Sequence, residues 1–400
     1  MPEQPKHKAA EIRFDGFDES WNTSRLDEAA TVERGKFTAR PRNDPKYFGG
    51  DIPFVQTGDV VHANRRLRNF SQTLNDEGLS VSKVFPANTI LITIAANIGD
   101  LAITDFPVAC PDSVVAIKPD EGFDTAFLFA VLGTKKSDLE AEATTNAQAN
   151  INLQILEPLE ICAPELPEQR KIGSYFKSLD RMIGLHQRKH DKLVTLKQAM
   201  LQKMFPQDGA TTPEIRFKGF DKPWGPKRFD DVATLINGRA YSQHELLDKG
   251  RYPVLRVGNF YTNSSWYYSD MELGDKYYAE NGDFLYTWSA SFGPHIWNGE
   301  KVIYHYHIWK VELSEMLEKG FALQLLQIDR ERILSTSSGS TMIHLTKEGM
   351  ESKEFMIPSP KEQEKIGIYF GKLDKLISKH ATQLEKLKNI KSACLEKMFV

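Results

Sequence analysis

Residues 168–176 read EQRKIGSYF and residues 362–370 read EQEKIGIYF, so one nine-residue pattern occurs twice in a chain of 400 residues. The likeness extends without a gap over residues 164–205 and 358–399, where about half of the positions are identical. Self-similarity at a fixed period is typical of a chain built from repeated units. The chain therefore contains two copies of one segment.

A second repeated marker lies before each of these segments. The sequence EIRFDGFD begins at residue 11 and is followed by Trp21, while EIRFKGFD begins at residue 214 and is followed by Trp224. The period of about 200 residues far exceeds the 20 to 50 of solenoid repeats, so each copy is a whole module. This order predicts a domain at residues 1–160, a helix at 161–206, a domain at 207–355 and a helix at 356–400.

The composition is typical of globular domains. The residues are 40% apolar and 26% charged, which suits two or three domains that each bury a core. The three cysteines lie far apart without metal-ligand spacing, so we expect reduced thiols and neither a disulfide framework nor a zinc site. No apolar run approaches the roughly 20 residues that span a bilayer, and no signal core begins the chain. We expect a soluble, cytoplasmic protein with no membrane contact.

The charge distribution is uneven along the chain. A net charge of −3 argues against nucleic-acid binding by the chain as a whole, because phosphate contacts come from Lys and Arg. The repeated segments nevertheless carry an excess of Lys and Arg, which predicts local basic faces. Solvated faces of long helices would account for the same charges equally well.

The repeated segments have the pattern of long coiled-coil helices. Apolar residues recur at heptad spacing, and prolines precede both starts. The d positions include Met182 and Leu376. The a positions, which form the predicted seam, are Ile172, Leu179, His186, Leu193 and Met200 in the first copy and Ile366, Leu373, His380, Leu387 and Cys394 in the second. At 1.5 Å per residue, roughly 38 residues form a rod of about 57 Å.

Each helix buries only its seam, and the chain supplies an equal partner for it. We expect antiparallel pairing, which would place the two domains at opposite ends and relate the halves by a pseudo-two-fold axis. His186 and His380 then fall near the centre of the pair. Because buried polar a positions fix helix register, that role is favoured over a histidine switch.

Between the markers, short strand patterns alternate with turn residues. The predicted fold class is α+β: two globular α/β domains joined by two long antiparallel helices that form a coiled coil. Core burial is expected for Trp288, Trp297 and Trp309, and His305 and His307 are expected on one side of a strand. Strands are predicted at residues 52–56, 89–94, 113–117, 252–257, 283–286 and 305–311, and helices at 127–132 and 321–328.

The two domains agree at framework glycines and differ at polar positions, which favours recognition of different ligands. Arg, Asn and Gln present donors and acceptors suited to base edges, and aromatic rings offer stacking faces. Ordinary surface placement would account for any one of these residues. The candidate DNA-binding residues are Arg65, Arg66, Arg68, Asn146, Gln148 and Asn150 in the first domain and Arg239, Tyr241, Arg256, Asn263, Ser340 and Thr341 in the second.

Catalytic motifs are absent from the sequence. It contains no G-x-x-x-x-G-K-[ST] loop, G-x-G-x-x-G turn, H-E-x-x-H or G-x-S-x-G elbow, and no Asn-Pro-Pro-Tyr or Asp-Pro-Pro-Tyr signature of an amino-methyltransferase. The sequence therefore predicts no catalytic, cofactor-binding or metal-binding residues. It favours a binding protein.

The combined pattern resembles the specificity subunit of Type I restriction-modification enzymes. Residues 164–176 and 358–370 carry the resemblance, together with the Leu-Asp that follows each and with residues 150–153 and 341–345 before the helices. The likeness covers the entire chain. Its specificity comes from motif, order and duplication together.

The resemblance implies that each domain is a target-recognition domain that reads one half of a split DNA sequence. It also implies that the helices act as a spacer and dock two methyltransferase subunits. The implied partners are double-stranded DNA, those methyltransferase subunits with S-adenosylmethionine, and restriction subunits with ATP and Mg, while this chain itself binds no cofactor. The alternatives are a coiled-coil interaction scaffold without a DNA role, and a self-contained nuclease or methyltransferase with unrecognised motifs.

Overall fold

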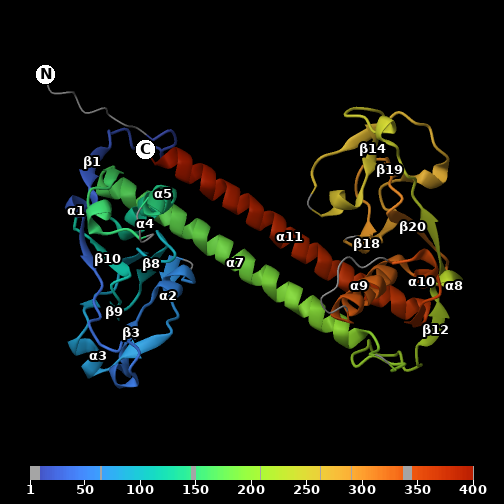
Figure 1. Ribbon diagram of the computed structural model, residues 1–400, viewed down its shortest axis with the longest axis horizontal. Helices are drawn as coiled ribbons and strands as arrows, with labels where there is room; N and C mark the ends of the chain where they lie inside the picture. The colour runs from blue at the N-terminus through green and yellow to red at the C-terminus, as the bar shows by residue number, and fades with distance from the viewer. Residues whose placement is uncertain are drawn as a thin grey trace. The chain divides into compact units, whose positions relative to one another are not determined.

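Two compact units make up the chain in the computed structural model, which describes residues 10–63, 65–145, 150–207, 209–261, 263–289, 291–336 and 345–399. Unit 1 comprises Met1–Lys189 and His380–Val400, and unit 2 comprises His190–Lys379. Two long helices, α7 (Leu166–Met204) and α11 (Pro360–Met398), each contribute residues to both units (Figure 1).

Unit 1 is built on two mixed sheets and a two-stranded ribbon. The larger sheet has the order β2-β10-β7-β8-β4, the smaller one has the order β5-β3-β9-β6, and β1 pairs with β11. The strands are β1 (Asn22–Arg25), β2 (Ala30–Arg34), β3 (Phe48–Phe54), β4 (Arg65–Leu67), β5 (Gln72–Leu74), β6 (Val84–Phe85), β7 (Ile90–Thr93), β8 (Leu101–Thr104), β9 (Val108–Ala109), β10 (Val114–Pro119) and β11 (Glu160–Ala163). Its shorter helices are α1 (Leu26–Ala29), α2 (Thr57–Val61), α3 (Asp76–Ser80), α4 (Thr125–Thr134), α5 (Lys136–Thr145) and α6 (Leu153–Leu156).

Unit 2 contains one antiparallel sheet, one mixed sheet and a two-stranded ribbon. The orders are β13-β20-β17-β18 and β15-β14-β19-β16, and β12 pairs with β21. The strands are β12 (Gly225–Arg228), β13 (Ala233–Asn237), β14 (Tyr252–Leu255), β15 (Tyr267–Ser269), β16 (Tyr278–Ala279), β17 (Phe284–Thr287), β18 (Gly293–Ile296), β19 (Val302–Tyr304), β20 (Ile308–Leu313) and β21 (Glu354–Ile357). Its shorter helices are α8 (Phe229–Val232), α9 (Lys319–Thr336) and α10 (Lys347–Glu351).

The two units share one topology. Strands β2-β10-β7-β8 repeat as β13-β20-β17-β18, antiparallel throughout, and β5-β3-β9-β6 repeat as β15-β14-β19-β16 with one parallel central pair in each. The glycines after β2 and β13 also match, because a Cβ on Gly35 would overlap the carbonyl oxygen of Pro111 and one on Gly238 that of His305. Unit 1 adds β4, parallel to β8 at the edge of its larger sheet.

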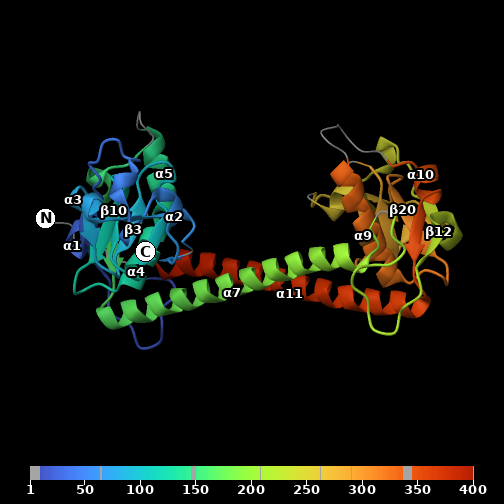
Figure 2. The same ribbon diagram turned by 90° about the horizontal axis from the view of Figure 1, so that it is seen from below.

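The long helices run antiparallel in unit 1 (Figure 2). Tyr175 Oη of α7 lies 3.4 Å from Cys394 Sγ of α11. Further toward the C-terminus of α7, His186 Nδ1 lies 2.8 Å from His380 Nδ1. The residue number of the α11 partner decreases as the α7 residue number increases, which shows that the two helices are antiparallel. The predicted seam residues Ile172 and Leu179 are buried in the core of this unit, and Leu387 and Cys394 pack against that core.

The same antiparallel pairing holds in unit 2. Lys197 Nζ of α7 donates to Asp374 of α11 at 2.6 Å, and the ring of Phe205 lies 6.2 Å from that of Phe370. The seam residues Ile366 and Leu373 lie in the core of this unit, and Leu193 and Met200 pack against it. The fold class is therefore α+β, with two globular α/β domains and two long antiparallel helices, as predicted.

Three expectations about individual side chains are wrong. Met182 and Leu376, predicted at d positions, are 42% and 44% exposed, because helix pairing buries a narrower stripe than the heptad pattern suggests. His305 and His307 precede β20 instead of facing one side of it, since β19 ends at Tyr304 and a turn follows. Among the three tryptophans, Trp309 is buried, whereas Trp288 and Trp297 are only half-buried.

Among the described residues, no helix combines the length and the apolar character needed to cross a bilayer.

Candidate nucleic-acid interface

The repeated nine-residue pattern anchors each long helix to its own domain. Glu168 is buried and accepts two hydrogen bonds from Arg13, at 3.0 and 2.6 Å. In unit 2, Glu362 accepts two bonds from Arg216, at 2.9 and 2.7 Å. Each Arg belongs to the EIRF marker of the same unit. Within each unit, this marker therefore binds the nine-residue pattern through a bidentate ion pair.

The glutamine beside each buried glutamate fixes the start of a domain helix. Gln169 Oε1 accepts from the backbone N–H of Asp124, the N-cap of α4, and its Nε2 donates to the carbonyl of Pro164 at 2.9 Å. Gln363 repeats both bonds in unit 2, with the backbone N–H of Glu318 before α9 and the carbonyl of Pro358. Buried polar groups are thereby satisfied on both sides.

The glycine of the pattern permits this close approach. A Cβ on Gly173 would lie 2.5 Å from Asp124 Oδ1, and one on Gly367 would lie 2.5 Å from Glu318 Oε2. The C-terminal phenylalanines complete the arrangement: Phe399 stacks on Phe176 in unit 1 at 5.5 Å. The repeated residues therefore form the domain-to-helix joint, which leaves recognition to other surfaces.

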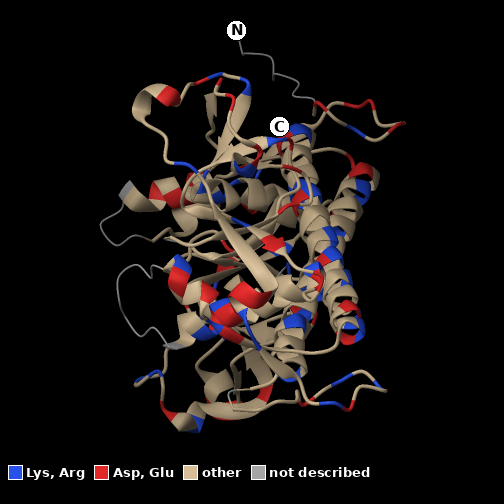
Figure 3. Cartoon of the chain, turned by 90° about the vertical axis from the view of Figure 1, so that its right-hand side faces the viewer, with Lys and Arg blue, Asp and Glu red and all other residues tan. Residues whose placement is uncertain are grey.

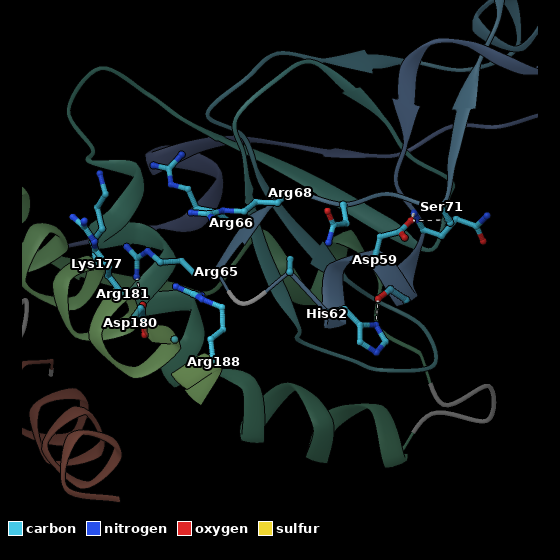
Figure 4. Close-up of a pocket in the computed structure, with 15 residues that line it drawn as sticks. Asp59, His62, Arg65, Arg66, Arg68, Ser71, Lys177, Asp180, Arg181 and Arg188 are labelled. Carbon is cyan, nitrogen blue, oxygen red and sulfur yellow. Dashed lines mark hydrogen bonds and ion pairs between the residues drawn. The ribbon is translucent and has the colours of Figure 1, made fainter. Parts of the chain in front are cut away.

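A basic groove lies in unit 1 between the domain and α7 (Figure 4). Its volume is about 780 Å³. Residues of α2, β4 and the segment after β4 form one wall, and α7 forms the other. Two Asp face six Lys and Arg, which are Arg65, Arg66, Arg68, Lys177, Arg181 and Arg188. This concave, positively charged shape is suited to a phosphate backbone.

Arg65 has a structural position in this groove. Its side chain is only 6% exposed, donates to Asp180 of α7 at 2.7 Å and lies 4.7 Å from the ring centre of Phe129. Burial lowers the pKa of the Arg65 guanidinium, and the hydrogen bond to Asp180 opposes that change. Its φ of 76° is rare for a residue with a side chain. Arg65 thus holds β4 against α7 and positions the arginines that follow.

Arg66 and Arg68, two of the predicted DNA-binding residues, follow Arg65 in the chain and line the groove. Arg66 is half-buried and pairs with Asp105, whereas Arg68 is exposed and has no ion pair within the described residues. Asn150 forms a β-bridge with Ala95 and does not line the groove. Asn146, Gln148, Ser340 and Thr341 lie outside the described residues.

The predicted residues of unit 2 are held by local contacts. Arg239 donates to Glu245 at 2.7 Å and stacks on Tyr241, whose hydroxyl is buried and whose pKa is raised by that burial. Arg256 lies 4.2 Å from the ring centre of Tyr267, and the Asn263 side chain accepts from Ser265. Arg239 and Tyr241 follow β13, whereas Arg256 and Asn263 lie between β14 and β15, and none of the four lines the groove described for unit 1.

Sequence reasoning missed an aromatic cluster in unit 2. The ring of His295 stacks on Phe260 at 4.0 Å, and its Nε2 lies 3.2 Å from Tyr261 Oη. Burial lowers the pKa of His295, and that of His305, to about 4. Both imidazoles are therefore neutral at pH 7. No spacing rule finds this cluster, because a loop and a strand of different sheets bring it together.

Charged residues also lie outside the groove. Charges of both signs lie along the long helices, and Lys and Arg outnumber Asp and Glu on α7 (Figure 3). Within the described residues, no group of three or more His, Cys, Asp or Glu is arranged to hold a metal ion.

Comparison with known proteins assigns the family. The Type I restriction modification DNA specificity domain family matches residues 18–195 and 221–389, once for each repeat. The Type I restriction enzyme MjaIX specificity subunit of Methanocaldococcus jannaschii is 22% identical, over 94% of this chain and 92% of its own length. The chain belongs to the family of Type I restriction-modification specificity subunits. Such subunits are the non-catalytic members that give these systems their DNA sequence specificity.

Solved structures share the fold. The S subunit of a Type I restriction-modification system from M. genitalium superposes with a TM-score of 0.68 at 16% identity, over 98% of this chain and 99% of that one. A chain from a structure that concerns complex assembly and conformational transition of the type I R-M system gives a TM-score of 0.50 at 17% identity, over 96% and 98%. Both repeats therefore have the fold expected of the family.

Proposed function

We propose that this chain recognises a bipartite, asymmetric DNA sequence, with one half read by each domain, and that its helices dock methyltransferase subunits. The observation that carries the proposal is a shared framework with unlike recognition surfaces. Unit 1 adds β4 and a basic groove, whereas unit 2 has aromatic and histidine residues around Phe260 and His295. Two domains that read the same half-site would have no reason to differ there.

Docking of two partner subunits is supported by a repeated exposed apolar position. Met182 in unit 1 and Leu376 in unit 2 occupy equivalent positions of the repeat, and both are more than two-fifths exposed. Large apolar side chains exposed on a helix are suited to packing against another helix. Because this equivalent position occurs once in each copy of the repeat, it fits two copies of one partner.

The catalytic chemistry belongs, in this proposal, to the partners. Methyltransferase subunits would supply S-adenosylmethionine, and restriction subunits would supply ATP and Mg, while this chain binds no cofactor. Free Cys110, Cys162 and Cys394 suit the reducing cytoplasm in which the complex would act.

The direct test compares adenine methylation in genomic DNA with and without this gene, in cells that also carry its methyltransferase partner. Long-read sequencing should find a gapped motif that is methylated only when the chain is present. Methylation that persists without the gene would contradict the proposal. A reconstituted complex that assembles but gives no DNA footprint would favour a scaffold instead.

A further inference from the structure

The two walls of the groove in unit 1 differ in chemistry. The α7 wall carries three exposed cations, Lys177, Arg181 and Arg188, and none of them has an ion pair within the described residues. The domain wall carries neutral polar groups beside its arginines, among them Gln56 and Asn69. Cations on flexible stems suit phosphates, and amides suit base edges.

The helix presents these cations on a face of their own. Spacings of four and seven residues place Lys177, Arg181 and Arg188 on one side of an α-helix, since 3.6 residues make a turn. By the same geometry, the seam residues Leu179 and His186 project from roughly the opposite side. Pairing with α11 therefore leaves the basic face open to the groove.

The one carboxylate on the basic face is already neutralised. Asp180 forms ion pairs with Arg65 of the domain and with Lys391 of α11, both at 2.7 Å. The domain's own carboxylate, Asp59, accepts from the backbone N–H of Gln56 at 2.9 Å and from Ser71 Oγ at 3.1 Å. Asp180 is therefore compensated by two cations. Asp59 keeps its negative charge, which is one charge against the three exposed cations of the α7 wall.

We infer that this face of α7 binds the phosphodiester backbone of the DNA half-site recognised by unit 1, while the domain wall reads its bases. This inference rests on the proposed function and extends it, because α7 then contacts DNA in addition to spacing the domains and docking partners.

The contact is one-sided, because the second helix lacks the matching charges. Across the repeat, Lys177 corresponds to Gly371, Arg181 to Lys375 and Arg188 to Thr382. A single cation of the three is retained. The half-site recognised by unit 1 should therefore have the greater share of backbone contact from a helix.

The test uses the assembled complex with its methyltransferase subunits. The triple variant Lys177→Gln, Arg181→Gln, Arg188→Gln is compared with wild type for binding of double-stranded DNA across a range of salt. Each lost phosphate contact lowers the slope of log affinity against log salt by roughly 0.9, so we expect a decrease of about 2 to 3. The methylated motif should stay unchanged in both halves, since phosphates carry no sequence information.

Two controls separate position from overall charge. The variant Lys361→Gln, Lys372→Gln, Lys379→Gln removes three exposed cations from α11, none of them the counterpart of a groove cation, and should leave the slope close to wild type. The variant Arg181→Lys, Arg188→Lys keeps both charges and should also retain the slope.

An unchanged slope in the α7 triple variant, or an equal decrease in the α11 control, would overturn the inference. A motif altered in one half would overturn the assignment of α7 to the backbone. Failure of the wild-type complex to bind DNA would count against the proposed function instead.

Discussion

A few residues determine how each domain sits on its helices. Glu168 and Glu362 are buried acids, and each is matched by a bidentate arginine from the marker that begins its repeat. Truncating either partner of such a pair would leave an uncompensated buried charge, which typically costs about 3–5 kcal/mol. Gly173 and Gly367 follow in the two patterns, and a Cβ at either position would overlap an atom of the domain.

Gly367→Ala and Gly371→Ala should change stability in opposite directions. A Cβ at Gly367 would lie 2.5 Å from Glu318 Oε2 and 3.0 Å from backbone atoms of Gly320 and Phe321, so overpacking should cost about 1–3 kcal/mol. At Gly371 nothing lies within 4 Å, so alanine should stabilise the helix by about 1 kcal/mol. Thermal unfolding of both variants measures the difference. Equal effects of one sign would contradict the close docking of α11.

At the residue scale, the sequence predicts which basic residues lie together in unit 1, but it does not predict what each of them contacts. The cluster Arg65, Arg66 and Arg68 was singled out as a DNA contact, and the structure places all three around one basic groove. The sequence alone does not reveal the hydrogen bond from Arg65 to Asp180, because these residues lie 115 positions apart in the chain. The cluster around His295 was missed for the same reason.

At the scale of elements, each long helix has distinct faces. One stripe of α7 packs against α11 and the domain cores, another carries the basic residues of the groove, and a third exposes Met182. Heptad periodicity predicted both helices, and α7 and α11 each span 39 residues. Pro167 and Pro360 lie in the first turn of their helices instead of before them, because proline is tolerated there. The heptad pattern overestimated the buried stripe, because periodicity alone does not say how closely two helices approach.

Strand prediction succeeded where apolar runs are continuous. Residues 89–94 and 113–117 correspond to β7 and β10. The predicted strand at residues 305–311 begins too early, because His305 forms an isolated bridge with Arg239 and Tyr306 and His307 form the turn before β20. Tertiary pairing, which the local pattern does not contain, fixed that boundary.

Leu179→Asp and Met182→Asp test the assignment of the helix faces. Leu179 is 3% exposed within the core of unit 1, so an unpaired carboxylate there should destabilise the unit by several kcal/mol. Met182 is exposed, and aspartate there should change stability by no more than about 0.5 kcal/mol. Chemical unfolding distinguishes them. Unchanged unfolding of Leu179→Asp would refute the seam.

At the scale of the whole molecule, duplication separates what is shared from what is variable. The joint between helix and domain is repeated almost atom for atom, in Arg13 with Glu168 and Arg216 with Glu362. The recognition surfaces differ. A partner that docks on the repeated helices should therefore bind twice, whereas each domain should have its own DNA half-site.

Met182→Asp and Leu376→Asp should each remove one docked methyltransferase subunit. A charge in a packed helix interface loses its hydration without a partner, so binding at that position should weaken strongly. Native mass spectrometry of the assembled complex should find one copy with either variant and none with both. Met316→Asp, at a domain position that is 46% exposed, is the control. Two copies bound to the double variant would place docking elsewhere.

The most direct measurement exchanges one domain and determines the methylated sequence. Residues 21–150 are replaced by the corresponding residues of a relative with a different target, while both helices and the second domain are kept. Long-read sequencing of DNA from cells with the hybrid should find one half of the motif changed, with the other half and the spacer retained. A motif changed in both halves, or in neither, would contradict the account.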